Sequence, residues 1–323
     1  MSDWNANERP GNDREWRLIE KMLMSVQDDS RKQRRWSIFF RILTFAYLFL
    51  LLILFMPGGK RGMQLPASGD DHTALVEVSG VIADGSEASA DKIVTGLRNA
   101  FEAEYSKAVL LRINSPGGSP VQSGYVYREI KRLREKYPDK KVYAVISDIG
   151  ASGAYYIAAA ADEIYADQAS IVGSIGVIMA GFGFTEAIDK LGVERRVMTA
   201  GENKALLDPF APMQKDQQQH VQMMLDDIHQ QFIDAVTTGR GERLKAEDHP
   251  EIFSGLFWTG DRALALGLVD GLASSGQVAR DVVGAEEIVD YTLRPDPFRQ
   301  LLGRFGASIG AGLMDQLGGS TLR

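Results

Sequence analysis

The sequence contains no cysteine, and only four of its 323 residues are histidines. The absence of cysteine excludes disulfide bonds, thiolate zinc sites, iron–sulfur clusters and cysteine nucleophiles. The histidines are His72, His220, His229 and His249, so histidine-based chemistry has few places in this chain. We expect neither a metal site nor a cofactor.

An excess of positive charge is also missing. Lys and Arg number 36 against 43 Asp and Glu, which gives a formal net charge of −7. A mildly acidic chain is a poor candidate for binding nucleic acid, which requires a basic face. The hydrophobic content of 45% and the charged content of 24% are ordinary for globular proteins and exclude a disordered chain. The length allows two domains, or one large domain with appendages.

One long apolar run stands out near the N-terminus. Between Trp36 and Met56 the only charged residue is Arg41, and Pro57-Gly58-Gly59 follows. A helix of this length spans about 30 Å at 1.5 Å per residue, which matches the hydrocarbon core of a bilayer. The run therefore predicts a single transmembrane helix over residues 36–57.

This run has two interpretations, a cleaved secretory signal and a permanent anchor. The 35 residues before it are long for a signal, and no small-x-small cleavage site follows Met56. Five Lys or Arg lie in residues 31–41 and two follow at 60–61. The positive-inside rule then favours an anchor with residues 1–35 in the cytoplasm and the rest of the chain on the far side. Residues 58–73 form a linker.

The part from residue 74 to residue 294 alternates between strand and helix patterns. Such alternation predicts an α/β fold with a parallel sheet and flanking helices. The predicted strands are 74–83, 108–113, 141–146, 163–166 and 193–198, and the predicted helices are 88–104, 119–136, 153–161, 185–191 and 213–239. Open parallel sheets bind ligands at the carboxyl ends of their strands, so the turns 114–118 and 148–153 are the places to look for chemistry.

These two turns carry a candidate nucleophile and candidate oxyanion donors. Ser152 stands between a strand and a helix among small residues, which exposes its hydroxyl and leaves the Gly153 amide free. The alternative is a plain helix N-cap. In the other turn, Ser115-Pro-Gly-Gly118 leaves glycine amides unshielded, and these could supply a second donor. Its alternative is a structural turn.

A serine nucleophile needs a base. No histidine occurs between Ser152 and His220, and His220 and His229 lie in a Gln/Asp-rich helical run that favours a surface position. Lysine is the remaining type of base, provided that its ammonium is desolvated. Lys204 directly follows the predicted strand 193–198 and has apolar neighbours. The alternative for Lys204 is a solvated surface charge.

Several motifs occur together in one order along the chain. They are an N-terminal anchor, Asn-Ser-Pro-Gly-Gly at 114–118, Gly-Ala-Ser-Gly-Ala-Tyr-Tyr-Ile-Ala at 150–158, Val-Gly-Ser-Ile-Gly-Val at 172–177, a lysine at 204 and Gly-Leu-Val-Asp-Gly at 267–271. As a set they resemble the signal peptide peptidase A (protease IV) family over residues 74–280. The resemblance implies a fold related to the Clp protease and crotonase group.

The resemblance also implies residue roles. Ser152 matches the nucleophile and Lys204 the general base of a Ser/Lys peptidase. Ser174 matches a serine that orients this lysine, and the amides of Gly118 and Gly153 match the oxyanion hole. Ala154 departs from the pattern, because relatives often have a second glycine there, and so do the residues next to Lys204.

Assembly, substrates and location follow from the same resemblance. Members of this one-domain size form homo-oligomeric rings in which the serine and lysine of a site come from neighbouring subunits. Their substrates are remnant signal peptides and other hydrophobic peptides at the lipid bilayer. The implied location is the bacterial inner membrane, with the catalytic domain in the periplasm.

Two other functions remain open from the sequence. One is a crotonase-like acyl-CoA enzyme, and the other is a catalytically inactive membrane scaffold with a protease-like body. The C-terminal tail, residues 295–323, has apolar residues at three- and four-residue steps interrupted by glycines. This pattern predicts an amphipathic helix of low intrinsic propensity. Such a helix could pack on its own domain or a neighbouring subunit, or it could contact membrane or substrate. The alternative is that the tail is disordered.

Overall fold

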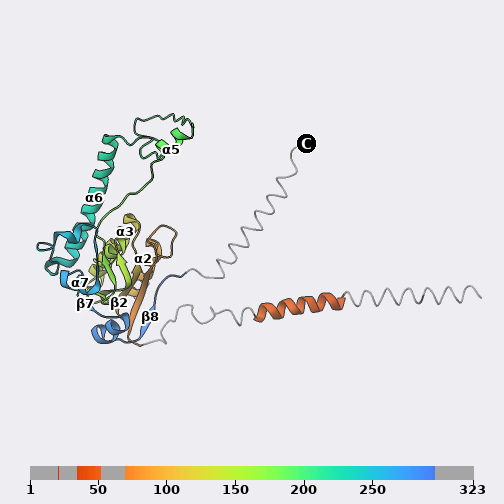
Figure 1. Ribbon diagram of the computed structural model, residues 1–323. Helices are drawn as coiled ribbons and strands as arrows, with labels where there is room; N and C mark the ends of the chain where they lie inside the picture. The colour runs from red at the N-terminus through yellow and green to blue at the C-terminus, as the bar shows by residue number, and fades with distance from the viewer. Residues whose placement is uncertain (1–20, 22–34, 52–69, 295–323) are drawn as a thin grey trace, which may run out of the picture. The chain divides into compact units, whose positions relative to one another are not determined.

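The computed structural model describes residue 21 and residues 35–51 and 70–294 (Figure 1). The chain divides into two compact units, Met1–Gly62 and Met63–Arg323. In the first unit, residues 35–51 form a helix with exposed apolar side chains. No helix within the described stretches is long and apolar enough to cross a membrane. The structure describes residues 36–51 of the predicted transmembrane helix over 36–57, and residues 52–57 lie outside the described part.

Other predicted segments also lie outside the described part of the chain. These are most of the N-terminal segment 1–35, the linker up to residue 69 and the C-terminal tail 295–323.

The second unit is built on one sheet, which Figure 1 shows with its strands side by side. The strand order is β6-β5-β3-β2-β1-β8, and β4 and β7 branch from β3. Every pairing is parallel except that between β5 and β6. The strands are β1 His72–Ser79, β2 Ser106–Ser115, β3 Lys141–Ala151, β4 Glu163–Ala166, β5 Ile171–Gly173, β6 Phe257–Thr259, β7 Gly271–Leu272 and β8 Ile288–Asp290. The predicted mixed α/β fold with a mainly parallel sheet and flanking helices is confirmed.

Apolar side chains pack on both faces of this sheet. Leu110 and Leu111 are consecutive residues of β2 and both are fully buried, but they belong to different clusters. This is the expected result of a nearly all-apolar strand, whose side chains alternate between two covered faces. The larger cluster lies against the helices α2 Ala90–Glu102, α3 Pro120–Lys136, α4 Gly153–Ala158, α6 Lys215–Arg240 and α7 Gly260–Leu266. The smaller one includes Val278 of η3 Val278–Val283, which follows α8 Ser275–Gln277.

The central strand β3 is longer than its sequence pattern predicts. Its residues 143–146 pair with β4, and its residues 149–151 pair with β5. The strand therefore runs through most of the stretch 148–152 that the sequence predicts as a tight turn. The change of partner along β3 brings its last residue directly to the turn at Ser152.

The predicted strand over 193–198 is wrong, because these residues have no regular structure. Val193, Val197 and Met198 are exposed, and Met198 is 97% accessible. No strand in the described part of the chain pairs with this stretch, and no sheet covers its apolar residues.

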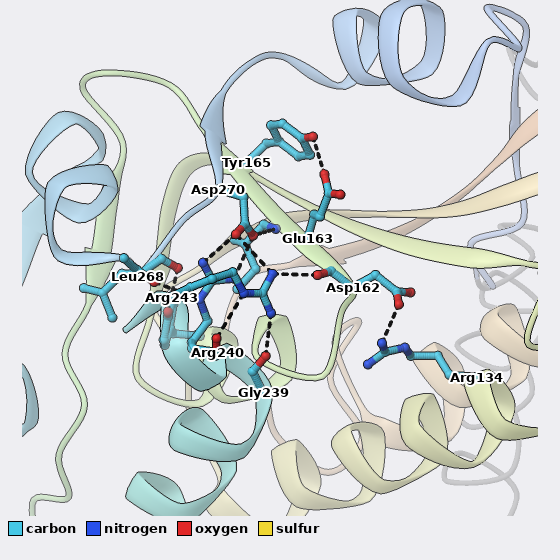
Figure 2. Close-up of polar contacts among 12 residues, drawn as sticks. Arg134, Asp162, Glu163, Tyr165, Gly239, Arg240, Arg243, Leu268 and Asp270 are labelled. Atoms are coloured by element: carbon cyan, nitrogen blue, oxygen red, sulfur yellow. Dashed lines mark hydrogen bonds and ion pairs between the residues drawn. The ribbon is translucent and has the colours of Figure 1, made fainter. Parts of the chain in front are cut away.

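A buried ion pair holds the C-terminal end of α6 (Figure 2). Arg240 is only 2% exposed, and its Nη1 and Nη2 donate to Asp270 Oδ2 and Oδ1 over 2.7 and 2.9 Å. The same carboxylate accepts a hydrogen bond from the Ile164 amide at 2.7 Å. The Tyr155 hydroxyl of α4 donates to the Leu268 carbonyl at 2.6 Å. The end of α6 is thereby joined to β4 and, through the 267–270 loop, to α4.

Residues 178–214 leave the sheet and form a separate lobe, here called the arm. Figure 1 shows its helix α5 Thr185–Lys190 far from the sheet, near the opposite end of α6 from the ion pair. Phe184 and Phe210 pack with their ring centroids 5.6 Å apart. Arg195 and Asp208 form an ion pair at 2.6 Å. These contacts join parts of the arm at its surface. Phe184 and Phe210 are themselves exposed, as are other apolar side chains of the arm, including Ile178, Phe182, Leu191, Met198 and Met213.

Candidate active site

Ser152 occupies the junction between the end of β3 and the start of α4. Its φ is +52° and its ψ is −125°, a backbone conformation that costs a non-glycine residue about 1–3 kcal/mol. The Ser152 amide donates to the Gly173 carbonyl at 2.8 Å, which fixes this turn to β5. The side chain forms no capping hydrogen bond with α4 and is half-buried. The hydroxyl is therefore not used as an ordinary N-cap.

The glycine turn before α3 lies directly against the Ser152 junction. Gly117 and Gly118 have φ values of +95° and +151°, which favour glycine. The Ile82 amide donates to the Gly117 carbonyl at 2.9 Å, and residues Ile82 and Gly118 form an isolated parallel β-bridge. A Cβ on Gly117 would lie 2.7 Å from the Gly153 nitrogen. The turn is thus held by residue 82 on one side and contacts α4 on the other.

Two backbone amides are free at this contact. The Gly118 nitrogen lies 3.3 Å from the point that a Cβ on Gly153 would occupy. Within the described part of the chain, neither the Gly118 amide nor the Gly153 amide donates a hydrogen bond. The two predicted oxyanion donors are therefore neighbours, next to Ser152, and available to a developing negative charge.

Ser174 lies at the same edge of the sheet as Ser152. Ala151 and Gly173 are directly paired in parallel strands, so the two serines follow at matching positions. Ser174 also has a positive φ, of +53°, and its amide donates to the Leu256 carbonyl at 2.7 Å. The structure brings together four of the five predicted site residues: Ser152, Ser174, Gly118 and Gly153.

Lys204 is the exception within one chain. It lies in a turn of the arm, exposed, with its amide donating to the Gly201 carbonyl at 3.1 Å. The preceding Asn203 accepts a hydrogen bond from Gln217 of α6 at 3.2 Å. Helix α6 contacts α4 through Phe232, which packs on Tyr156 at 5.0 Å between centroids. From Gln217 to Phe232 the helix rises about 22 Å, taken at 1.5 Å per residue, so the Lys204 turn is held far along α6 from the nucleophile helix.

In the described part of the chain, no histidine forms a hydrogen bond with Ser152. His229 contacts the Ile175 carbonyl at 3.2 Å, His249 pairs with Glu251 at 3.1 Å and His72 contacts Tyr291 at 3.0 Å. Among residues 21, 35–51 and 70–294, no group of three or more His, Asp or Glu is arranged to hold a metal ion.

Sequence reasoning missed one residue that shapes this site. Ile82 lies in the predicted strand 74–83, but the strand ends at Ser79 and Ile82 instead holds the glycine turn by main-chain bonds. In the sequence Ile82 is recognisable only as an apolar residue. That property does not distinguish a strand residue from one that holds a turn.

Comparison with known proteins gives the family. The profile of Peptidase family S49 matches residues 134–287. A putative protease of Synechocystis sp. is 37% identical over 201 residues, which covers 62% of this chain and 69% of that protein. A putative signal peptide peptidase SppA of Enterococcus faecium is 28% identical, with 68% and 64% covered. The chain belongs to the S49 family of peptidases, the signal peptide peptidase A family.

A further relative carries a different name. A protein of Brucella abortus named Na(+)/H(+) antiporter NhaA is 47% identical over 214 residues, which is 66% of this chain. The match spans only 28% of that protein's length. Most of the Brucella protein therefore lies outside the region that it shares with this chain.

Proposed function

We propose that this chain is a serine endopeptidase that uses a Ser152/Lys204 dyad to cut remnant signal peptides and other apolar peptides. The observation that carries the proposal is the Ser152 junction: a serine held at positive φ, with an uncommitted side chain, beside the two free amides of Gly118 and Gly153. A strained residue at a strand end next to unused donors fits a catalytic role better than a structural one.

The chemistry follows from these groups. Lys204 takes the proton of the Ser152 hydroxyl, and the oxygen attacks the carbonyl carbon of the scissile peptide bond. The negative charge that develops on the carbonyl oxygen is stabilised by the Gly118 and Gly153 amides, at about 3 kcal/mol for each donor. Lys204 then gives its proton to the leaving amine, and water hydrolyses the acyl-enzyme. Ser174 accepts or donates a hydrogen bond to hold the lysine.

We also propose that the dyad forms between subunits of a homo-oligomeric ring. Lys204 is exposed, and its turn is held about 22 Å along α6 from the contact between α6 and the nucleophile helix α4. A lysine acts as a base only when its amine is desolvated, and a neighbouring copy would supply that desolvation. The exposed apolar side chains of the arm, among them Phe182 and Met198, are suited to burial against such a copy.

The substrate and the location belong to the same proposal. Apolar peptides left in a bilayer suit an enzyme placed at the membrane, and the apolar run 36–57 is the segment proposed to place it there. The proposed location is the bacterial inner membrane, with the peptidase unit in the periplasm. Carbonate extraction of cell membranes tests it, because an anchored chain stays in the membrane pellet.

The decisive experiment compares the full-length wild-type chain with Ser152→Ala. Fluorophosphonate should label the wild-type protein at Ser152, and a synthetic signal peptide should be cleaved. Ser152→Ala should lose both properties while its circular dichroism spectrum stays unchanged. Labelling without cleavage would favour a different acyl substrate, as in the crotonase alternative, and neither property in the wild-type chain would favour the inactive scaffold.

A further inference from the structure

Two buried polar atoms at the Ser152 turn lack hydrogen-bond partners. In the described part of the chain, the buried side-chain nitrogen and oxygen atoms without a partner are Ser123 Oγ and Trp258 Nε1. Each lies next to a glycine near Ser152: Gly153 directly follows Ser152, and the Gly173 carbonyl accepts a hydrogen bond from the Ser152 amide. Ser123 Oγ faces Gly153, and Trp258 Nε1 is 3.5 Å from the point that a Cβ on Gly173 would occupy.

An unpaired buried hydroxyl needs a physical reason, because it costs about 1–3 kcal/mol and most buried polar atoms are satisfied. Ser123 is fully buried on α3, one turn after the glycine turn. Alanine would avoid this cost, but it would leave the space that the Ser123 oxygen occupies empty. The hydroxyl lies at the contact between α3 and α4, close to the Gly153 backbone and to the Gly118 amide.

The geometry at Gly153 shows what the hydroxyl does. A Cβ on Gly153 would overlap Ser123 Oγ, and it would lie 3.3 Å from the Gly118 nitrogen and 3.5 Å from Ser123 Cβ. The Ser123 oxygen therefore occupies the space beneath the Gly153 backbone, on the side where the Gly118 amide also lies.

We infer that Ser123 is a positioning residue of the oxyanion hole. Its hydroxyl oxygen acts as a spacer between α3 and the first residue of α4, and it sets the placement of the Gly153 amide relative to the Gly118 amide. This inference rests on the proposed function, since it assigns Ser123 to the same site. Ser123 does not contact the reacting atoms, because its oxygen is buried beneath the turn.

The role has a specific kinetic signature. Oxyanion donors act on charge that is present in the transition state and not in the bound substrate. Ser123→Ala should therefore lower kcat at least 10-fold and leave KM within about twofold of wild type. The rate of fluorophosphonate labelling of Ser152 should fall by a similar factor. The melting temperature should stay the same or rise, since the variant removes an unsatisfied hydroxyl.

The matched control is Ser106→Ala. Ser106 is also a buried serine, but it lies at the opposite end of β2 from the site, and its hydroxyl bonds to the Ala108 carbonyl at 3.3 Å. Its kcat should equal that of wild type. All kcat values are taken per Ser152 titrated with fluorophosphonate, at a temperature below every melting transition, so a change in folding does not affect the comparison.

A second measurement tests the contact without using activity. Gly153→Ala should lower the melting temperature, because its methyl group overlaps the Ser123 hydroxyl. In the Ser123→Ala background the same change should cost less, since the two methyl groups would then be 3.5 Å apart, an ordinary contact. Additive effects in this double-mutant cycle would overturn the spacer role.

The outcomes separate the two proposals. An active Ser152→Ala variant contradicts the proposed function itself. If Ser152→Ala is inactive while Ser123→Ala keeps the wild-type kcat, the peptidase proposal stands and the role assigned to Ser123 is wrong.

Discussion

Arg240 and Asp270 form an ion pair that is joined by two hydrogen bonds (Figure 2). The Arg240 side chain is 1% exposed and the Asp270 side chain is 14% exposed. The pair joins the last residue of α6 to the loop before β7. Because α6 carries the arm at its other end, this pair fixes the base from which the arm extends. Arg243 and the Ile164 amide also donate to this carboxylate, at 3.1 and 2.7 Å.

Removal of Arg240 is expected to destabilise the peptidase unit strongly. Arg240→Met leaves the Asp270 carboxylate largely buried without its main partner, and breaking a buried pair in this way costs about 3–5 kcal/mol. Urea unfolding followed by circular dichroism measures the change. Arg280→Met is the control, because Arg280 pairs with Asp281 at the surface and its loss should leave the unfolding midpoint unchanged. Equal midpoints for both variants would contradict the prediction.

Stability should decline in acid below about pH 4, with Glu129 as a main cause. The hydrogen bond from Arg132 lowers the pKa of Glu129 to about 2, with burial opposing it and Arg98 adding to it. A carboxylate whose folded pKa lies below its unfolded value stabilises the fold above the unfolded pKa, and this contribution is lost as the pH falls toward the folded value. Unfolding free energies between pH 7 and pH 2.5 should show the decline.

Asp270 contributes in the same direction. Burial alone would raise the pKa of its carboxyl, but the hydrogen bonds from Arg240 and the Ile164 amide outweigh burial and lower it.

Glu129→Gln should flatten the pH dependence of the unfolding free energy between pH 4.5 and pH 2.5, and Asp281→Asn, a surface control, should not. An unchanged profile for Glu129→Gln would show that its pairing with Arg132 is not a source of acid sensitivity.

Gly118→Ala should lower the catalytic rate strongly. Its φ of +151° is unfavourable for alanine, and the added Cβ would overlap the Ile82 carbonyl oxygen. The turn must shift to relieve the overlap, which displaces one oxyanion donor and should lower kcat about 10²–10³-fold. Gly276→Ala has open space around the new methyl group and should retain wild-type activity. A Gly118→Ala variant with normal kcat would exclude this amide from the site.

Mixed oligomers test whether the dyad forms between chains. Ser152→Ala and Lys204→Ala should each be inactive alone, and co-expression should restore part of the activity, because some sites then receive an intact serine from one chain and an intact lysine from another. Co-expression of Ser152→Ala with the double variant supplies no intact serine and should restore nothing. No recovery in oligomers shown by mass spectrometry to be mixed would place both groups in one chain.

Lys204→Arg should be as inactive as Lys204→Ala. A guanidinium stays protonated in proteins and cannot accept the serine proton. Cleavage of a synthetic signal peptide by the purified full-length variant measures this, with Lys190→Arg as the control, since Lys190 is a surface lysine paired with Glu186 at 3.7 Å. Activity in Lys204→Arg would show that Lys204 is not the base.

Much of this fold was readable from local patterns. The strand at 163–166 was predicted residue for residue, and the helix predicted at 119–136 was observed at Pro120–Lys136. Apolar runs and helical spacing are properties of neighbouring residues, so they survive without knowledge of the tertiary structure. The short strands β6, β7 and β8 have only two or three residues and exist because distant segments pair with them, so no local pattern revealed them.

The sequence by itself determined the residue types that the Ser152 turn requires: glycines at 117 and 118 where φ is positive, and a serine between a strand and a helix. Only the tertiary structure decided which of the candidate residues meet. It placed Gly118 against Gly153 and left Lys204 on the arm, away from Ser152 in the same chain. The physical reason is that backbone conformation depends on local residues, whereas proximity depends on strand register, on how α3 packs on α4, and on where a long helix is held.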